Sequence, residues 1–316
     1  MNSNIPIPHE SPAPRADPFA LAAHDAYRRW RDAKLAAYPS RLEELAVEVT
    51  DPKRLSRGEV QNIVGNCRRA NMALILLPSP AHCTRPGLAR LGEQIGLRRL
   101  DQNLCAEEDA ISAIRVTQQQ RANEYIPYTS RPLSWHTDGY YNRTESQIRA
   151  WTLFCAQNAA EGGENALLDH EIAYILLRDQ DPELIRALMQ PDAMTIPPNL
   201  EAGREIRPAR VGPVFSVNPG DFTLHMRYSA RKRNIQWKAD AATHAAVTFL
   251  AGLFSSPSPY ILRHRLEPGE GLVSNNVLHN RSGFKDHSDP ARHRLLYRAR
   301  YFDRIAGTGA EDINPN

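Results

Sequence analysis

The sequence has few of the features that mark disulfide-rich or nucleic-acid-binding proteins. Its 316 residues include only four cysteines, and no two of them form a Cys-x-x-Cys pair. A disulfide framework or a zinc knuckle is therefore not expected, and the thiols should be reduced. The formal net charge is only +3, which gives little support to a nucleic-acid partner. One basic cluster, over residues 227–238, is expected to be a solvated face.

Long hydrophobic runs are also missing. The longest one, from Met72 to Leu77, has the length of a strand, whereas a membrane span needs about 18 or more apolar residues. The N-terminus lacks a basic region followed by a long apolar stretch, so we expect no signal peptide. These absences predict a cytoplasmic protein with no membrane partner.

The overall composition, with 41% hydrophobic and 24% charged residues, is that of a globular protein. Prolines recur throughout residues 1–18, which predicts a disordered or extended arm. Residues 19–316 are expected to form a single domain. Within it, residues 19–100 should supply a helical layer and the first strands, and residues 110–304 the β-rich core.

Local patterns predict helices early in the chain and mainly short strands after residue 110. Residues 19–38 are rich in Ala, Leu, Arg and Lys without an internal breaker, which favours a helix. Many short strands separated by turn residues favour a mainly β fold with helices, built on an antiparallel barrel or jelly roll. The further helices are expected at 57–70, 86–95, 170–178, 182–189 and 239–253, and the strands at 72–77, 111–116, 147–155, 165–168, 214–217, 223–226, 260–265, 271–274 and 293–302.

His136 and Asp138 form the first candidate for a chemical site. Residues two apart on an extended chain point to the same side, so both side chains could reach one metal ion. A second triplet of this kind, at 287–289, precedes a proline in a polar stretch and indicates a loop. His136 instead lies between aromatic residues and before Gly139, a setting that suits a half-buried ligand. A hydrogen-bonded His–Asp pair without a metal is the alternative.

His279 is the second candidate, although it lies far along the chain from Asp138. A sheet that closes on itself brings such distant strands together. Two histidines and one carboxylate would leave coordination positions open, as in non-haem Fe(II) oxygenases. The absence of a thiolate ligand argues against a structural zinc site. The alternative is an ordinary surface or core histidine.

The C-terminal strand carries a row of arginines. A buried guanidinium needs an anionic partner, and arginine binds carboxylates through two parallel hydrogen bonds. A buried arginine face could therefore hold a dicarboxylate co-substrate and a second anion, whereas an exposed one would be a solvated stripe. With a period of two, Arg292, Arg294, Arg298 and Arg300 share one face, and Leu295, Tyr297, Ala299 and Tyr301 share the other.

Four short blocks, taken in this order, resemble the taurine dioxygenase-like family, which includes gamma-butyrobetaine hydroxylase. These blocks lie at 128–141 (with Ser-Trp-His-Thr-Asp-Gly-Tyr-Tyr at its end), 162–164 (Gly-Gly-Glu), 279–284 (His-Asn-Arg-Ser-Gly-Phe) and 294–298 (Arg-Leu-Leu-Tyr-Arg). The resemblance implies a dioxygenase that depends on Fe(II), 2-oxoglutarate and O₂, folded as a double-stranded β-helix (jelly roll) with an N-terminal helical layer.

The same resemblance implies roles for particular residues. His136, Asp138 and His279 would be the metal ligands. Arg294 would bind the distal carboxylate of 2-oxoglutarate, although the interval of 15 positions after His279 is somewhat long and leaves Arg292 as a rival. Two further residues complete the expected set, Arg298 for this carboxylate or an anionic substrate group, and Asn165 for the co-substrate in place of the threonine common in the family.

The implied reaction is hydroxylation, or another oxidation, of a small polar metabolite with release of succinate and CO₂. Asp138 favours hydroxylation, because halogenating relatives carry a small residue at the matching position. Four aromatic residues could form a cage for a quaternary ammonium group or pack in the core. These expected substrate-binding residues are Tyr128, Trp135, Tyr140 and Tyr141.

Four questions stay open at this point. A non-catalytic protein that binds a metal or a small molecule, or acts as a sensor, could use the same fold. The sequence also does not distinguish a sulfonate, an amino acid or a betaine as the substrate. The site of oxidation and the presence of a homo-oligomer are equally undetermined.

Overall fold

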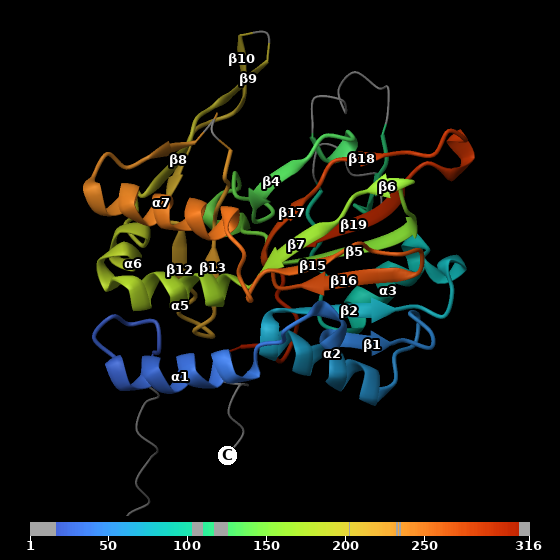
Figure 1. The fold of residues 1–316 in the computed structure, drawn as a ribbon, viewed down its shortest axis with the longest axis horizontal. Helices are drawn as coiled ribbons and strands as arrows, with labels where there is room; N and C mark the ends of the chain where they lie inside the picture. Colours follow the sequence, from blue (N-terminus) through green and yellow to red (C-terminus); the bar gives the residue numbers. More distant parts are fainter. Residues whose placement is uncertain are drawn as a thin grey trace, which may run out of the picture.

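A computed structural model describes residues 17–102, 110–116, 126–201, 203–231, 233 and 235–309. The part of the expected N-terminal arm before residue 17, and Cys105, lie outside these residues. The described chain mixes helices and strands, with two larger sheets and several small ones (Figure 1). None of the described helices has both the length and the apolar character needed to cross a bilayer.

The larger sheet has six strands in the order β1-β2-β16-β5-β19-β3. Only β1 and β2 run parallel, and the other neighbours are antiparallel. Sequence-distant segments thus lie side by side, as Figure 1 shows for β16 beside both β2 and β5. The strands are β1 (Ala46–Glu48), β2 (Met72–Leu76), β3 (Ser112–Ile114), β5 (Ala150–Gln157), β16 (Glu270–Ser274) and β19 (Leu295–Tyr301).

Two helices, α2 (Arg57–Ala70) and α3 (Arg85–Gln94), belong to a hydrophobic core on the outer face of this sheet. The start of α2 is fixed by a capping box at Ser56. The Ser56 side chain accepts a hydrogen bond from the Glu59 backbone N–H, and the Glu59 carboxylate accepts one from the Ser56 backbone N–H. Alternate residues of the strands supply the sheet side of this core. They include Phe154, Val273, Ala299 and Tyr301.

The smaller sheet is antiparallel, with four strands in the order β15-β7-β17-β4. Its outer face packs on helices through a second hydrophobic core, to the left of the sheets in Figure 1. The strands are β4 (Leu133–His136), β7 (Asn165–Leu168), β15 (Leu262–His264) and β17 (Leu278–Arg281), and the helices are α1 (His24–Ala37), α5 (His170–Gln180), α6 (Pro182–Leu188) and α7 (Ala241–Ser255).

A third core lies between the facing sides of the two sheets. It contains Leu167 from the smaller sheet and Trp151, Leu272 and Leu296 from the larger one. Because strand residues alternate between faces, every second residue of β5, β17 and β19 points into this inner space. The inner faces therefore decide which polar residues can meet.

Shorter elements complete the fold. The hairpin β9–β10 projects at the top of Figure 1 and exposes Leu200. Three-residue and four-residue turns of 3-10 helix connect other segments, among them η1 (Leu42–Leu45), η3 (Ile126–Tyr128) and η5 (Pro290–Arg292). The small strands are β6 (Glu161–Gly162), β8 (Met194–Ile196), β9 (Asn199–Glu201), β10 (Arg204–Arg207), β11 (Arg210–Gly212), β12 (Phe215–Val217), β13 (Leu224–Met226), β14 (Gln236–Trp237) and β18 (Phe284–Lys285).

A buried ionic cluster joins α1 to the start of α5. The Lys34 ammonium lies 2.7 Å from Asp169 and 2.5 Å from Glu171, and all three side chains are almost completely buried. Asp169 also accepts hydrogen bonds from the Asn71 side chain and the Glu171 backbone.

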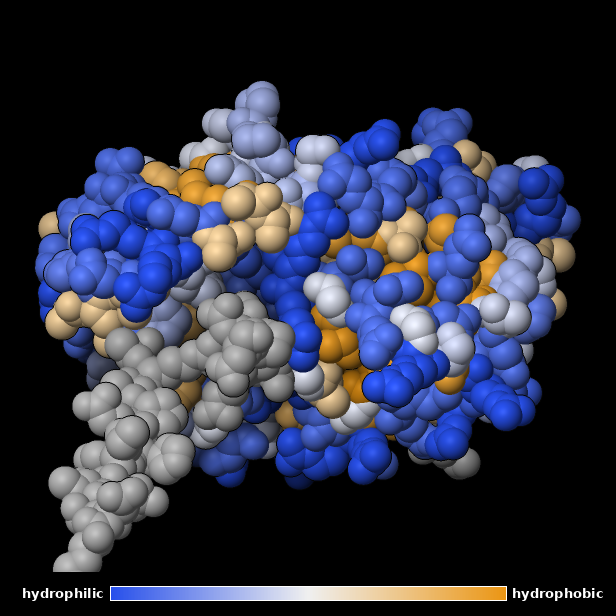
Figure 2. Space-filling model, turned by 90° about the horizontal axis from the view of Figure 1, so that it is seen from below, coloured by the Kyte–Doolittle hydropathy of each residue, from blue (hydrophilic) through white to orange (hydrophobic). Residues whose placement is uncertain are grey.

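In the view from below, hydrophilic residues dominate the face that includes α1, and hydrophobic ones appear between them mainly on the side of the six-stranded sheet (Figure 2).

The expected element types are confirmed, with boundaries shifted by a few residues. The expected helix at 57–70 and the strand at 165–168 match α2 and β7 exactly in extent, whereas the helix expected over 19–38 begins only at His24. Among the described cysteines, Cys67, Cys83 and Cys155 are free and buried. Burial raises the pKa of each thiol to about 12, consistent with reduced structural thiols.

Candidate metal centre

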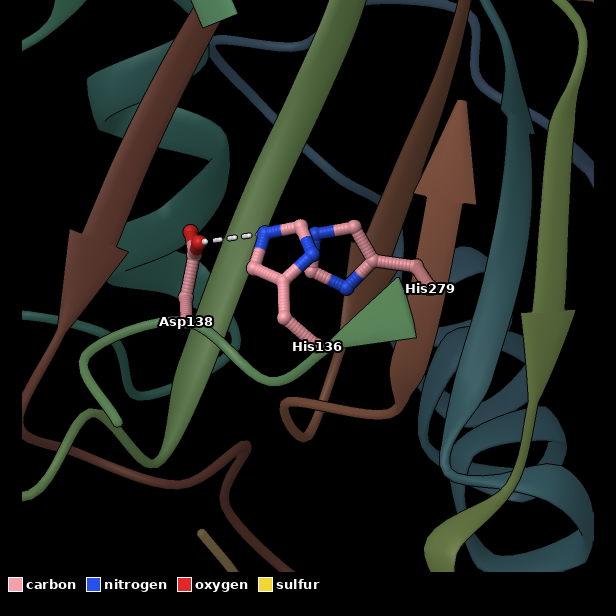
Figure 3. A group of neighbouring side chains, drawn as sticks. All are labelled: His136, Asp138 and His279. Atoms are coloured by element: carbon pink, nitrogen blue, oxygen red, sulfur yellow. Dashed lines mark ion pairs between the residues drawn. The ribbon is translucent and has the colours of Figure 1, made fainter. Parts of the chain in front are cut away.

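Two histidines from distant parts of the chain face each other on neighbouring strands. His136 ends β4 and pairs in register with His279 of β17, and their ring centroids are 4.2 Å apart. Asp138 follows two residues later, with its Oδ1 atom 3.6 Å from Nε2 of His136 (Figure 3). One potential ligand atom from each of the three residues lies within 4.8 Å of the other two. The structure thus brings together the three expected ligands.

The two imidazole rings are oriented by the backbone. Nδ1 of His136 lies 2.9 Å from the carbonyl oxygen of Ser134, and Nδ1 of His279 lies 3.0 Å from that of Val277. A carbonyl can only accept, so each Nδ1 carries the proton and each Nε2 keeps its lone pair. This is the tautomer that a metal-binding histidine needs, held in the way typical of metal sites. The ring of Trp151 packs against His279 with centroids 4.9 Å apart.

The loop that carries Asp138 is held by Asn276. The Asn276 side chain accepts a hydrogen bond from the Asp138 backbone and donates to the carbonyls of Asp138 and Ile148. Gly139 then turns the chain with a φ of +67°. A Cβ at this position would lie 2.3 Å from the Ile148 side chain, so both the conformation and the space require glycine here.

Replacing Gly139 by alanine should therefore displace the Asp138 loop. We expect a loss of about 1–3 kcal/mol in the free energy of unfolding, from the strained φ and the forced contact with Ile148. Urea denaturation would measure it. Gly58→Ala is the matched control, because no atom lies within 4 Å of a Cβ there and the φ is not left-handed; a similar loss in both variants would contradict this account.

The Asp138 carboxylate lies in a buried, positively charged setting. Burial favours its neutral form, but the charges of Arg298 and Arg300 outweigh this and hold its pKa well below the usual range. Its Oδ2 atom is 3.7 Å from an Nη1 of Arg298 and accepts no hydrogen bond. A buried carboxylate oxygen without a hydrogen bond is unusual and suits a cation ligand.

Near this triad, Arg294 is buried and points into a small pocket. It is 5% exposed, its guanidinium lies over the Phe284 ring, and its Nη1 atom has no hydrogen-bond partner. Burial lowers the pKa of Arg294 to about 10. Arg292, in contrast, lies on the exposed η5 turn. The pocket is lined by residues that include Cys155, Gly162, Gly163, Asn165 and Arg294.

Asn165 lies in the same pocket, at the start of β7. It pairs with Arg281 of β17, and both side chains share the inner face with His279. Arg281, which sequence reasoning missed, is also buried, and its guanidinium lies over the Phe284 ring at 4.8 Å from the centroid. It donates to the carbonyls of Pro127 and Thr129, which holds the segment before β4. The sequence signal that could have found Arg281 is its position two residues after His279, within the block 279–284 that resembles the family.

The remaining arginines of β19 have partners in the protein. Arg300 binds Asp101 and donates to the Tyr141 hydroxyl over 2.8 Å. Arg298 faces Asp138, as described above. The expected alternation holds, since Ala299 and Tyr301 belong to the core on the helix-covered side. Arg294, Arg298 and Arg300 therefore face the interior, whereas Arg292, expected on the same face, lies on the exposed η5 turn before β19 begins.

The four aromatic candidates do not form one group. The expectation that Trp135 binds substrate must be corrected. Trp135 lies on the opposite face of β4 from His136 and stacks on Phe254 of α7, with ring centroids 4.9 Å apart. Tyr128 is buried in the core between the sheets. Tyr140 and Tyr141 follow the metal loop and pack edge to face against each other. Of the four, Tyr141 contacts a charged group of the site, because its hydroxyl accepts a hydrogen bond from Arg300.

Two imidazoles and one carboxylate without a thiolate, buried between two sheets, define a non-haem iron site of the oxygenase class. The chain belongs to the taurine catabolism dioxygenase TauD, TfdA family, whose sequence profile matches residues 47–300. Dioxygenases of this type use Fe(II), 2-oxoglutarate and O₂. The residues present fit these groups, since Asp138 Oδ2 and Arg294 Nη1 are buried polar atoms without hydrogen bonds.

Comparison with known proteins agrees with this assignment. A uridine-5'-phosphate dioxygenase of Amycolatopsis sp is 33% identical over 178 residues, which cover 53% of this chain and 60% of that protein. The match thus spans less than two thirds of the relative. An asparagine oxygenase solved with Fe(II), 2S,3S-3-hydroxyasparagine and succinate shares the fold, with 14% identity, a TM-score of 0.50 and coverage of 81% of this chain and 93% of that chain. The non-heme iron oxygenase OrfP in complex with Fe is similar at 18% identity and a TM-score of 0.52, covering 86% of this chain and 89% of that chain.

Proposed function

We propose that this protein is an Fe(II)- and 2-oxoglutarate-dependent dioxygenase that hydroxylates, or otherwise oxidises, a small polar metabolite. The observation that carries the proposal is the convergence of His136, Asp138 and His279, each with a ligand atom within 4.8 Å of the others. When bound, the iron and 2-oxoglutarate supply the oxidising chemistry, with succinate and CO₂ as by-products. The family match supports this reaction class.

The protein's own residues would bind and orient the reactants. His136, Asp138 and His279 would hold the metal. The carbonyl contacts at Nδ1 direct the Nε2 atoms of both histidines toward it, and a pKa well below the usual range keeps Asp138 ionised at neutral pH. Arg294 would bind the distal carboxylate of 2-oxoglutarate, with Asn165 beside it in the pocket. Arg298 would keep Asp138 ionised and in place. The surrounding apolar residues would exclude water from the reaction.

We also infer that the two larger sheets are the halves of a double-stranded β-helix, and that residues 19–316 form one dioxygenase domain. The core shared by the facing sides of the two sheets supports this arrangement, and the three ligands come from β4, from the loop after it and from β17 of the four-stranded sheet. We propose a small-molecule substrate, a cytoplasmic location, and no nucleic-acid or membrane partner. Uridine 5′-phosphate is one substrate to test, because a relative is named for it.

The direct test is succinate formation from 2-oxoglutarate in the presence of Fe(II), ascorbate and O₂. We expect slow succinate release without a substrate and faster release with the right one. A panel of nucleotides, sulfonates, amino acids and betaines can be screened first by thermal shift under anaerobic conditions. A non-catalytic binder or sensor would take up the metal but form no succinate, which would contradict the proposal.

Arg294 and Arg292 make opposite predictions for 2-oxoglutarate binding. Arg294→Gln removes a buried, charge-assisted contact and should raise the half-saturating 2-oxoglutarate concentration by about tenfold or more. Arg292→Gln changes an exposed residue and should leave it within about twofold. Both values follow from uncoupled succinate formation at varied 2-oxoglutarate. A larger effect at Arg292 than at Arg294 would reverse the assignment.

A further inference from the structure

Two arginines near the metal loop have no anionic partner in the described part of the chain. Arg207 ends β10, and Arg210 begins β11. Their side-chain hydrogen bonds go to the backbone carbonyls of Pro208, Pro197 and Ala209, and the buried Nε of Arg210 has no partner at all. Arg300 and Arg298, by contrast, already face carboxylates.

A third arginine fastens this pair to the metal centre. Arg227, expected to lie on a solvated face, is instead 7% exposed and donates only to carbonyls in the described structure. Its Nε binds the carbonyl of Tyr140 and its Nη2 that of Arg210, each over 2.8 Å. Because both carbonyls bind the same guanidinium, which is only a few ångströms wide, the start of β11 is held beside Tyr140, two residues after Asp138.

The segment after Arg227 runs along the strand of the metal ligand. Ser229 forms an antiparallel bridge with His136, and Thr137 donates to the carbonyl of Tyr228. Arg227 and Ser229 are two apart in this extended stretch and share a side with His136. The β10–β11 region is thus attached to the metal strand as well as to the loop that follows it.

The charges around Arg207 agree with this placement. Burial is the main cause that lowers its pKa, the charge of Arg210 lowers it further, and the hydroxyls of Tyr140 and Tyr141 act in the opposite direction. The geometry places them together as well, since Arg207 ends β10, Arg210 begins β11 three positions later, and Arg227 joins the Arg210 carbonyl to that of Tyr140. Like charges held together in a partly buried place are costly unless an anion joins them.

We propose that Arg207 and Arg210 form a binding subsite for a phosphate group of the substrate, beside the metal centre and bounded by Tyr140 and Tyr141. This rests on the proposed function, because the same molecule would present its reacting carbon to the iron. A phosphate dianion can accept from two guanidinium forks at once, and arginine matches its geometry bidentately. A monoanionic carboxylate would leave one of the two arginines uncompensated. Arg227 is a positioning residue that holds β11 in place.

The test compares a phosphate-bearing probe with its neutral counterpart. Ribose 5-phosphate, ribose and inorganic phosphate are titrated calorimetrically into the full-length protein with Fe(II) and 2-oxoglutarate under anaerobic conditions. We expect ribose 5-phosphate to bind at least about tenfold more tightly than ribose, and inorganic phosphate to compete with it. Equal affinities, or no binding of either phosphate probe, would overturn the subsite.

Matched variants locate the effect. Arg207→Gln and Arg210→Gln should each weaken ribose 5-phosphate binding by about tenfold or more, without changing the affinity for 2-oxoglutarate. Arg204→Gln is the control, because it removes the same charge from an exposed position of the same hairpin. If Arg204→Gln weakened ribose 5-phosphate binding as much as the other two variants, the arginines would act only through their overall positive charge, and the proposed subsite would be wrong.

The same samples separate this inference from the proposed function. Uncoupled succinate formation without a preference for phosphate-bearing probes would support the proposed dioxygenase function and contradict the proposed subsite. The opposite result is selectivity for phosphate that depends on Arg207 and Arg210, with no succinate formed under any condition. It would support the subsite and contradict the dioxygenase function. Circular dichroism of each variant establishes that the hairpin change has not unfolded the protein.

Discussion

Replacing His279 by alanine is expected to abolish stoichiometric Fe(II) binding and to lower succinate formation by more than about a hundredfold. Even outer-shell partners of metal ligands typically cost 10–100-fold, and a direct ligand should cost at least that much. His279 is one of only two imidazoles of the triad, and its free Nε2 is oriented toward the other ligands by the Val277 carbonyl. Anaerobic equilibrium dialysis with Fe(II) measures binding independently of turnover.

The control for this experiment is His287→Ala. His287 belongs to the other His-x-Asp triplet, which the structure places in the loop before η5 and outside the triad. It should keep both iron binding and succinate formation. Retention of one equivalent of iron by His279→Ala would contradict the assignment of the ligand, whatever happened to activity.

The largest expected effect on stability comes from Lys34. Lys34→Met should lower the free energy of unfolding by about 3–5 kcal/mol, because it leaves two buried carboxylates, Asp169 and Glu171, without their cation. Burial alone would raise the pKa of Glu171, yet Lys34 and other nearby cations lower it to about 2. Loss of Lys34 therefore removes the main charge that keeps Glu171 ionised in the core.

Urea denaturation at neutral pH measures this loss, and Lys53→Met, at an exposed position of the loop before α2, serves as the control. The low pKa of Glu171 gives a second readout. Its contribution is complete above its ordinary value near 4.5 and disappears as the pH falls toward about 2. The wild type should therefore lose stability across that interval, and Lys34→Met should lose less, since its Glu171 is no longer stabilised. Equal pH dependence in both proteins would argue against the ion pair as its source.

Much of the fold could be predicted because its signals are local. Helix α2 has a capping residue and a uniform pattern, and β7 is a short apolar run after a double glycine, so both were placed correctly. Strand β17 was not among the predicted strands, although it carries His279. Its four residues, Leu278 to Arg281, lack a strand pattern, and they are extended because they pair with both β7 and β4. Tertiary pairing of this kind leaves no trace in a single sequence.

The site residues show the same division. Alternation predicts which residues of β19 share a face, whereas the sequence left open whether the arginine face is buried or solvated. Trp135 was expected among the aromatic residues that bind substrate or pack in the core. Because neighbours on a strand point to opposite faces, it lies away from His136 and packs on α7. Arg227 was expected on a solvated face and Lys34 was not singled out, since nothing in a sequence reveals which charged side chains find buried partners. The subsite proposed at Arg207 and Arg210 depends on the buried Arg227, which binds the carbonyls of Tyr140 and Arg210.

The reverse side of β4 has a consequence for how this protein can be modified. Trp135 rests on Phe254 near the end of α7, while the very next residue supplies an imidazole to the opposite side of the strand. A cavity or an oversized side chain at that helix would tilt the strand and shift the imidazole, with no change to any atom near the reactants. Directed evolution that selects for altered turnover should therefore recover substitutions on α7, in a layer remote from the chemistry.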